Sequence, residues 1–576
     1  MKIAVRAVTI AALALALLPV HQAAASPSLF GHVSERVGGA PIAGVCVRLN
    51  PASPCATFTD GNGDYFIDLS GAPDGVLWQV TYSKPGYQTG SDFIVISGNT
   101  QTSFTMVRPP CATARASTPT MSVYLPNITK TLGGPGGFVT PFIVQNTAGA
   151  NTDLEVTFNS FATGTCVARR TVAALKPGTS FADVPNNDLD LPDNAQFSVV
   201  VRSFGASVVS VVNEHNGSGD RAEALSYDGF ASGATSVFLP NIVRKFFGFH
   251  TPFIMQNLGT AQTVATATFV GRSGEPGAMI TRTIAAGQSQ FIEPNVEPSL
   301  VDGGAYAVTV KADQPIAVVV NTHNDDASVA HPAAYSTDGI AGGSSNVYGP
   351  YAAKNALNSD RPNTISTIVV QNLGTSSITP TLTFTPFGGG SATTFTGPAT
   401  PAGGAWAFDP RFVNGAASAT ATLCGSAAST GCLADGEYSF KASAAGTIAA
   451  AVNVLNPTSA MGYTATATPG TKYALPNVTR TLGGAWTTPI MLQSVTATGA
   501  SLDWRRFSDG ALVTTQTVTM PAGSAMRIDP RNVAGLSDDT QYAVTVTGTG
   551  GQVAAIVVEL APGGDNAMIY EGFASP

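Results

Sequence analysis

Apolar and polar residues alternate along short stretches of this chain, and turn-forming residues separate the stretches. The clearest runs are residues 306–311 and 542–547, in which aromatic and β-branched side chains occupy alternate positions. A period of two is typical of a strand that buries one face. Beyond the first 25 residues no stretch of the sequence keeps helical spacing. The pattern therefore predicts an all-β fold.

One order of landmarks occurs four times between residue 121 and the last residue. Each passage opens on an aromatic-Leu-Pro-Asn motif or a degenerate form of it. Successive openings are 114, 110 and 126 residues apart, counted between Asn127, Asn241, Tyr351 and Asn477. Solenoid and propeller repeats have periods of roughly 20–50 residues, so this longer period indicates a duplicated domain.

Each copy has the length and turn content of one sandwich. Seven or so short strands in about 115 residues, with Gly, Pro and Asn between them, are expected of an immunoglobulin-like β-sandwich. We therefore expect four tandem sandwiches: repeat 1 (121–235), repeat 2 (236–345), repeat 3 (346–470) and repeat 4 (471–576).

Composition supports this fold and excludes one class of partner. Only 11% of the residues are charged, 44% are apolar, and 61 Gly with 38 Pro supply the turns that many short strands need. The formal net charge is -8, and the 28 basic residues are spread thinly. Nucleic acid requires a concentrated Lys/Arg surface, so it is not expected as a partner.

The N-terminus is typical of an export signal. Lys2 and Arg6 precede an apolar run at residues 10–20, and three alanines at 23–25 provide a small-residue cleavage site. We expect residues 1–25 to be a signal peptide and the protein to be secreted or displayed at the cell surface. No later run of about twenty apolar residues occurs, so no membrane span is expected.

The six cysteines are expected to form disulfides, as is usual in exported proteins. Proximity in sequence favours Cys46 with Cys55 and Cys424 with Cys432, which leaves Cys111 with Cys166. Six thiols permit fifteen pairings, so proximity alone ranks this one first. A metal role is disfavoured because the sequence has no Cys-x-x-Cys pair and no two histidines four residues apart.

Residues 28–109 form a different module, which a linker (110–120) separates from the repeats. Its landmarks are Gly31-His-Val33, the Pro-Ile-Ala-Gly-Val step at 41–45, the Thr-Asp-Gly-Asn-Gly-Asp-Tyr hairpin at 59–65, and Gly86-Tyr87. These motifs resemble the carboxypeptidase regulatory-like domain family. The resemblance implies a small transthyretin-like, carbohydrate-binding-like sandwich that is non-catalytic and serves in folding or docking.

The hairpin of this module offers a weak candidate metal site. Asp60, Asn62 and Asp64 occupy the first, third and fifth positions of a possible calcium loop. Tyr65 stands where an EF-hand loop needs Gly, and Gly71 stands where it needs Glu. We expect a tight turn here rather than a metal site.

Two further features of the repeats invite a binding role. The polar cluster at residues 213–216 is echoed at 321–324 but not fully in the other copies, so strand-end asparagines that form turns are the preferred interpretation. Phe246, Phe247 and Trp486 lie in loops after the openings and are candidate ligand-binding residues. Packing against a neighbouring repeat is the preferred alternative for the Phe246-Phe247 loop.

No motif for catalysis is present. The sequence contains no Gly-x-Ser-x-Gly elbow, no His-Glu-x-x-His and no phosphate-binding Gly-rich loop, so neither an enzyme nor a cofactor is expected. We expect a secreted or surface-associated structural or adhesive protein, whose tandem sandwiches form a scaffold or stalk. The alternative is a carbohydrate-binding protein that uses the N-terminal module or the loop aromatics. Partners would be glycans or proteins of the cell surface or matrix.

Overall fold

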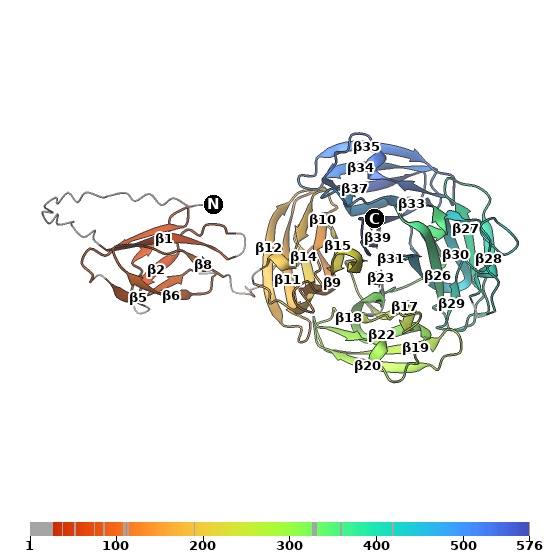
Figure 1. Cartoon of the computed structure of the whole chain (residues 1–576), viewed down its shortest axis with the longest axis horizontal. Helices are drawn as coiled ribbons and strands as arrows, with labels where there is room; N and C mark the ends of the chain where they lie inside the picture. Colours follow the sequence, from red (N-terminus) through yellow and green to blue (C-terminus); the bar gives the residue numbers. More distant parts are fainter. Residues whose placement is uncertain are drawn as a thin grey trace, which may run out of the picture. The chain divides into compact units, whose positions relative to one another are not determined.

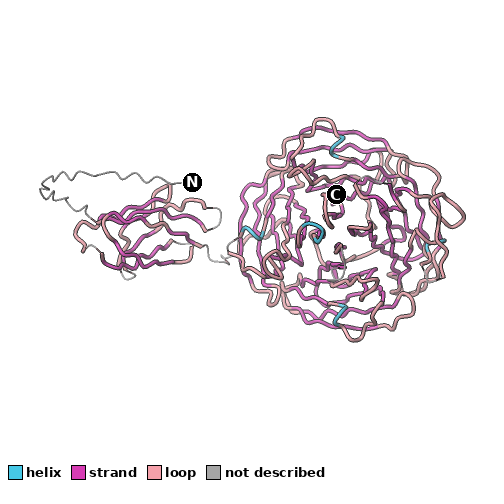
Figure 2. Tube along the Cα trace, in the orientation of Figure 1, coloured by secondary structure: helices cyan, strands magenta, loops and turns pink. Residues whose placement is uncertain are grey.

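The computed structural model describes residues 27–574 except 37–38, 51–52, 74, 85–86, 108–110, 112–113, 189, 325–330, 358–359 and 418–419. The described chain is nearly all strand, as the alternating pattern predicts, and its only helices are five 3-10 turns of three residues (Figure 2). None of these helices has the length and apolarity that crossing a membrane requires. The expected signal peptide lies outside the described residues.

The chain divides into two compact units, Met1–Pro109 and Pro110–Pro576. The first is a β-sandwich with sheets β4-β1-β7 (β8 also pairs with β1) and β3-β2-β5-β6. Val80 and Tyr82 lie fully buried between these sheets. Its strands are β1 (Ser28–Glu35), β2 (Cys46–Leu49), β3 (Thr57–Phe58), β4 (Asp64–Asp68), β5 (Val76–Ser83), β6 (Gly90–Ile96), β7 (Asn99–Gln101) and β8 (Phe104–Met106).

The second unit consists of four sandwiches. Repeat 1 contains β9 (Met121–Lys130), β10 (Phe142–Asn146), β11 (Thr152–Ser160), β12 (Cys166–Leu175), β13 (Ser180–Asp183), η1 (Pro185–Asn187), β14 (Ala195–Ser203), β15 (Val208–Asn216), η2 (Gly219–Arg221) and β16 (Glu223–Asp228). Repeat 2 contains β17 (Ala234–Arg244), β18 (Phe253–Asn257), β19 (Thr263–Gly271), β20 (Ala278–Ile284), β21 (Ser289–Ile292), η3 (Pro294–Val296), β22 (Gly304–Asn324) and β23 (Ala333–Asp338).

Repeat 3 contains β24 (Ser344–Lys354), β25 (Ala356–Leu357), β26 (Pro362–Asn372), β27 (Thr381–Pro386), β28 (Thr393–Thr396), β29 (Ala405–Phe408), η4 (Val413–Gly415), β30 (Gly436–Asn456) and β31 (Ser459–Thr464). Repeat 4 contains β32 (Lys472–Arg480), β33 (Ile490–Ser494), β34 (Gly499–Arg506), β35 (Leu512–Thr519), β36 (Ala525–Ile528), η5 (Pro530–Asn532), β37 (Thr540–Thr549), β38 (Val553–Leu560), β39 (Ala567–Glu571) and β40 (Phe573–Ala574). The first strands of repeats 2 and 3 begin two residues before the expected boundaries.

Each repeat pairs its strands in the same order. In repeat 1 one sheet is β12-β11-β14-β9 and the other is β13-β10-β15-β16, and repeat 4 follows the same plan with β35-β34-β37-β32 and β36-β33-β38-β39. In repeats 2 and 3 the hairpin strands are continuous, so β22 and β30 each run through both sheets. The sheet that contains β10, β18, β26 or β33 is called the inner sheet below.

The Leu-Pro-Asn openings form a bulge in the first strand of a repeat. The register with the partner strand shifts between Leu239 and Ile242 and between Leu475 and Val478. Proline has no N–H to offer a ladder, so the strand is irregular there. In repeat 1 the Tyr227 hydroxyl donates to the Asn127 carbonyl at 2.7 Å and accepts from its N–H at 3.2 Å. A buried tyrosine thus satisfies the backbone that the bulge leaves unpaired.

The four sandwiches close into a ring around a common centre (Figure 1). The inner sheet of each repeat packs against the opening strand of the repeat before it: β18 and β22 contact β9, β26 and β30 contact β17, β33 and β38 contact β24, and β10 and β15 contact β32. The last of these contacts joins repeat 1 to repeat 4. The extended stalk expected from tandem repeats is therefore wrong.

The closure has a physical cause in the inner sheets, which bury both faces. All five residues of β10, of β18 and of β33 are buried. Phe142 and Val144 belong to the core of repeat 1, whereas Ile143 and Val211 belong to the core of repeat 4. An extended arrangement would expose this second apolar face to water.

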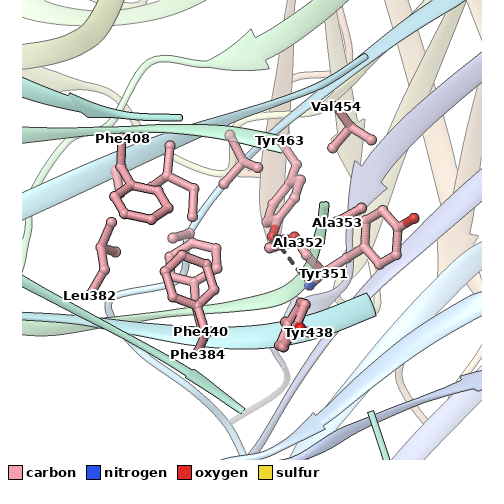
Figure 3. Close-up of a cluster of buried hydrophobic side chains, with 14 of the residues drawn as sticks. Tyr351, Ala352, Ala353, Leu382, Phe384, Phe408, Tyr438, Phe440, Val454 and Tyr463 are labelled. Atoms are coloured by element: carbon pink, nitrogen blue, oxygen red, sulfur yellow. Dashed lines mark hydrogen bonds between the residues drawn. The ribbon is translucent and has the colours of Figure 1, made fainter. Parts of the chain in front are cut away.

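Repeat 3 shows how one core continues into the next. Phe384, Phe408 and Phe440 pack together inside the sandwich, and Tyr463 donates its hydroxyl to the carbonyl of Tyr351 at the opening strand (Figure 3). The same cluster includes Met491 and other apolar residues of repeat 4. The hydrophobic core therefore crosses the boundary between these repeats.

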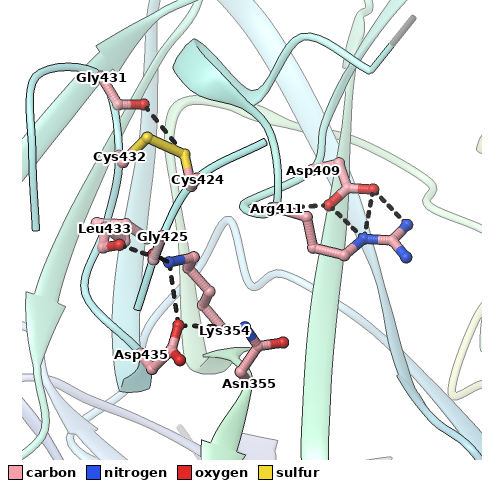
Figure 4. The surroundings of a disulfide bond; sticks show 10 residues. All are labelled: Lys354, Asn355, Asp409, Arg411, Cys424, Gly425, Gly431, Cys432, Leu433 and Asp435. Carbon is pink, nitrogen blue, oxygen red and sulfur yellow. Dashed lines mark hydrogen bonds and ion pairs between the residues drawn. A yellow bond between two sulfur atoms is a disulfide. The ribbon is translucent and has the colours of Figure 1, made fainter. Parts of the chain in front are cut away.

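The three disulfides join Cys46 to Cys55, Cys111 to Cys166 and Cys424 to Cys432, the pairing that proximity favours. The loop of the third lies beside a buried cation, Lys354 (Figure 4). The Lys354 ammonium is 3.0 Å from an Asp435 carboxylate oxygen and donates to the carbonyl of Leu433 at 2.8 Å. Cations at the equivalent position of the other repeats bind in the same way: Lys130, Arg244 and Arg480.

The closed ring predicts a compact scattering profile. A protein comprising residues 110–576 is expected to have a radius of gyration of about 23 Å, the value for a compact chain of this length. Small-angle X-ray scattering measures it. A row of four separate sandwiches would give about twice that value, and such a result would contradict the ring.

Candidate functional site at the centre of the ring

The closing strands of the four repeats meet at the centre of the ring. Strands β16, β23, β31 and β39 lie one beside the next around it. Their equivalent residues, which we call the hub residues, are Asp228, Asp338, Thr464 and Glu571. Carboxylate oxygens of the three acidic hub residues lie within 4.8 Å of one another. In the sequence the three acids appear as an Asp-Gly or Glu-Gly pair, in which the acid is the last residue of the closing strand.

Backbone groups hold the hub carboxylates in place. The N–H of Asp228 donates to Oδ1 of Asp338 at 3.3 Å, and the Thr464 hydroxyl donates to Oε1 of Glu571 at 2.7 Å. The Thr464 N–H donates to the same Glu571 oxygen. Each of these bonds joins two different repeats, so the hub residues link neighbours around the ring.

The hub disfavours the charged form of its carboxylates. Burial raises the pKa of Asp228 and of Asp338 well above the usual range, and repulsion from Glu571 raises both further. Burial also raises the pKa of Glu571, although hydrogen bonds from Thr464 oppose this. The hub residues line a partly enclosed cavity of about 200 Å³. No Lys, Arg or His is among the described residues that line it.

Asp565, which lies just before β39, connects all four repeats near the opposite end of the closing strands. Its carboxylate accepts from the N–H of Ala334 at 2.5 Å and from the N–H of Ala460 at 2.9 Å. Its own N–H donates to the carbonyl of Ala222 at 3.1 Å. Burial raises the pKa of this fully buried aspartate, and the two backbone bonds partly oppose the shift.

Two of the four junctions between repeats contain a buried glutamate between two asparagines. Between repeats 4 and 1, Glu559 accepts from the side-chain amides of Asn477 and Asn213, each at 2.8 Å. Between repeats 1 and 2, Glu214 accepts from Asn127 at 3.0 Å and from Asn321 at 3.2 Å. The Asn of an opening motif thus binds a Glu of its own repeat, and an Asn of the next repeat completes the set.

The other two junctions have lost this arrangement. Between repeats 2 and 3, Asn241 and Asn453 contact each other at 3.4 Å, and the Glu position holds Thr322. Between repeats 3 and 4, Tyr351 and Val454 make the equivalent position apolar. The prediction that Asn213 and Asn321 form turns at strand ends is wrong, because they lie within β15 and β22 and donate to Glu559 and Glu214. They link neighbouring repeats at these two junctions.

Burial shifts the titration of both glutamates. It raises the pKa of Glu214 to about 7 and of Glu559 to about 8, although the asparagine bonds favour the charged forms. Desolvation disfavours a charge, and it is the largest cause at both residues. Both glutamates are therefore expected to change charge near neutral pH.

The loop aromatics have different surroundings. Trp486 packs edge-on against His215 of repeat 1, with ring centroids 5.6 Å apart, so it belongs to the junction that closes the ring. The ring centroids of Phe247 and Phe246 are 4.7 Å apart, and Phe247 is 86% exposed. The preferred packing of this loop against a neighbouring repeat is therefore wrong for Phe247. Burial lowers the pKa of His215 to about 4, which keeps it neutral beside Trp486.

The hairpin of the first unit is built as a turn. Oδ1 of Asp60 accepts from the N–H groups of Asn62 and Asp64, at 2.8 and 2.9 Å. Asp64 pairs with Nδ1 of His32 at 2.8 Å. Among the described residues, the group of three possible metal ligands lies at the hub and not at this hairpin.

One face of the first unit is apolar and exposed. Leu77 and Val95 are cross-strand partners, and Phe93 lies two residues from Val95 on the same face of β6. They are 59%, 55% and 65% exposed. No sequence motif marks this face. Alternation along β5 does place Leu77 on the face of the strand that does not carry the buried Val80 and Tyr82.

Comparison with known proteins adds little. No protein-family model and no curated protein matches this chain. Among solved structures, the major pilin subunit of Bacillus cereus is 6% identical, covers 89% of this chain and 97% of its own, and has a TM-score of 0.14. A pilus protein of Streptococcus pneumoniae is 9% identical, covers 77% and 93%, and has a TM-score of 0.12. A tetra-tandem repeat of a large adhesion protein is 12% identical, covers 75% and 94%, and has a TM-score of 0.10. Likenesses this slight carry no argument about function.

Removing Asn213 is expected to weaken the junction of repeats 4 and 1. The substitution Asn213→Ala withdraws one of two amide donors from the buried Glu559, at a cost of about 2 kcal/mol. Chemical denaturation at pH 8 measures the loss. Asn453→Ala is the matched control, because its partner across the junction is a neutral amide, and about 1 kcal/mol is expected. Equal losses would contradict a special role for the glutamate.

Stability is also expected to fall as the pH rises. Glu214 and Glu559 bind protons more tightly when folded, so their contribution is complete below pH 4.5 and is lost as the pH rises through about 7 and 8. A difference of one between the folded and unfolded pKa of a group corresponds to about 1.4 kcal/mol. Denaturation curves between pH 5 and 9 test this. Glu559→Gln cannot titrate, so its stability should vary less, and an unchanged slope would contradict the assignment.

Proposed function

We propose that this protein is a non-catalytic structural or adhesive protein of the cell exterior, in which the ring is a rigid scaffold. The observation that carries the proposal is the use of the repeated polar residues. Glu559, Glu214 and Asp565 all bind groups of other repeats and are buried, so they serve the assembly of the ring. A scaffold needs such fixed junctions, whereas an enzyme needs polar groups that reach a substrate.

The first unit is the docking part in this proposal. Its two-sheet sandwich and its capped hairpin support the resemblance to the carboxypeptidase regulatory-like family. The exposed apolar face with Leu77, Phe93 and Val95 is the surface on which it would bind a protein of the envelope or matrix. Apolar groups that remain in contact with water favour association.

Carbohydrate binding remains the second candidate. The exposed Phe247, with Phe246 packed edge-on against it, offers an aromatic surface of the kind on which sugar rings stack. Trp486 supports this candidate less, because its ring packs edge-on against His215 within the junction of repeats 4 and 1. Docking through the first unit and carbohydrate binding through the loop aromatics use different units of the chain, so these two can be tested separately.

Replacing the apolar face of the first unit is expected to weaken adhesion. The double substitution Leu77→Ser and Phe93→Ser removes apolar area from that face, so binding of the mature protein to whole cells or matrix should fall about tenfold. Surface plasmon resonance or a cell-binding assay measures it. Met279→Ser is the matched control, since Met279 is 70% exposed on the ring.

The outcomes separate the candidates. Equal binding by all three proteins contradicts docking through the first unit. A glycan array that loses its signal with Phe247→Ala, but not with the double substitution, supports carbohydrate binding instead. An array with no signal from any protein rules out that second candidate.

A further inference from the structure

The acidic hub residues lie where one ion could bind all three. Asp228, Asp338 and Glu571 come from three different repeats, and each offers a carboxylate oxygen within 4.8 Å of the others. Calcium binds oxygen ligands at 2.3–2.6 Å, so two ligands of one ion lie no more than about 5 Å apart. We propose that the hub binds one Ca²⁺ ion, which the carboxylates of three repeats share.

A second observation points to a ligand. Oδ1 of Asp228 is buried and accepts no hydrogen bond, although the backbone of Glu571 stabilises the carboxylate as a whole, and the residue is only 8% exposed. A buried carboxylate oxygen without a partner is costly, and native structures almost always satisfy such an atom. Asp228 lines the hub cavity together with the other two acids, so a cation in that cavity would satisfy its oxygen.

The surroundings of the three carboxylates favour a bound cation, because no basic side chain among the described residues of the cavity neutralises them. Besides the three acids, the lining holds the hydroxyl residues Thr464 and Thr466 but no basic side chain among those described. The cavity of about 200 Å³ is only partly enclosed and has room for an ion with several waters.

The ligand chemistry favours calcium among the common ions. All the protein donors are oxygens, whereas zinc and copper prefer nitrogen or sulfur. Calcium accepts irregular sets of six to eight oxygens, whereas Mg²⁺ requires near-octahedral geometry at about 2.1 Å. Three carboxylates and a hydroxyl from four non-identical strands form an irregular set. The ion would fasten repeats 1, 2 and 4 at the centre of the ring and remove the repulsion among their carboxylates.

Thermal unfolding of the mature protein tests the proposal. After treatment with a chelator, 1 mM CaCl₂ is expected to raise Tm by at least about 5 °C, because a ligand that binds only the folded state stabilises it. Isothermal titration calorimetry should give one Ca²⁺ per chain. Asp228→Asn and Asp338→Asn should each abolish the shift. Asp60→Asn should retain it, which separates the hub from the hairpin of the first unit.

Each other outcome overturns the proposal. No shift with Ca²⁺, or the same shift in the hub variants, excludes a calcium site at the hub, and an equal shift with 1 mM MgCl₂ excludes calcium as the specific ion. If the hub variants do not fold, Tb³⁺ added to the unaltered protein is the second measurement. Tyr473 lines the same cavity, so tyrosine-excited Tb³⁺ emission that Ca²⁺ displaces supports the site, and its absence overturns it.

Discussion

The burial of both faces of the inner sheets is the constraint on which the second unit depends. One face of β10 completes the core of repeat 1, and the other joins the core of repeat 4. A sheet that is apolar on both sides needs two partners, since either face alone would remain in water. Each repeat supplies its opening strand as the outer partner of the next. A chain of such units ends with one uncovered sheet and one unused strand, and the ring pairs the two.

The four junctions solve the same packing problem with different chemistry. Two use a buried Glu between asparagines, one uses Asn241 against Asn453, and one is apolar around Tyr351. The buried glutamates do not by themselves show that their junctions are more stable, because the cost of desolvating a carboxylate offsets much of the energy of its hydrogen bonds. The variety instead makes each junction distinct. The opening strand of repeat 4 carries Asn477, and it packs on the inner sheet of repeat 1, which carries Asn213. An inner sheet with an apolar residue in place of Asn213 would leave Glu559 without its second amide donor.

The sequence predicts the sandwiches well and their arrangement poorly. Alternation, turn residues and cysteine spacing depend on neighbours along the chain, and they indicate the fold class and the three disulfide pairs. The ring depends on which apolar residues face another repeat. The sequence around Ile143 does not show whether this side chain packs in the core of its own repeat or in that of repeat 4. The hub was equally hidden: Asp228, Asp338 and Glu571 stand beside turn glycines, so they resemble ordinary turn landmarks. A fully apolar run such as residues 142–144 was the one available sign of a strand buried on both sides.

Asp565 makes the backbone hydrogen bonding of the other three repeats depend on the fourth. It lies near the C-terminal end, yet its carboxylate and its N–H complete the backbone bonds of Ala334, Ala460 and Ala222 in the three earlier repeats. Without the Asp565 carboxylate, the N–H groups of Ala334 and Ala460 would be buried without an acceptor, which is costly. A protein without the fourth repeat would also expose the apolar face of β10 that carries Ile143. The fourth repeat therefore acts as the keystone of the ring, because it binds each of the other three through the single residue Asp565.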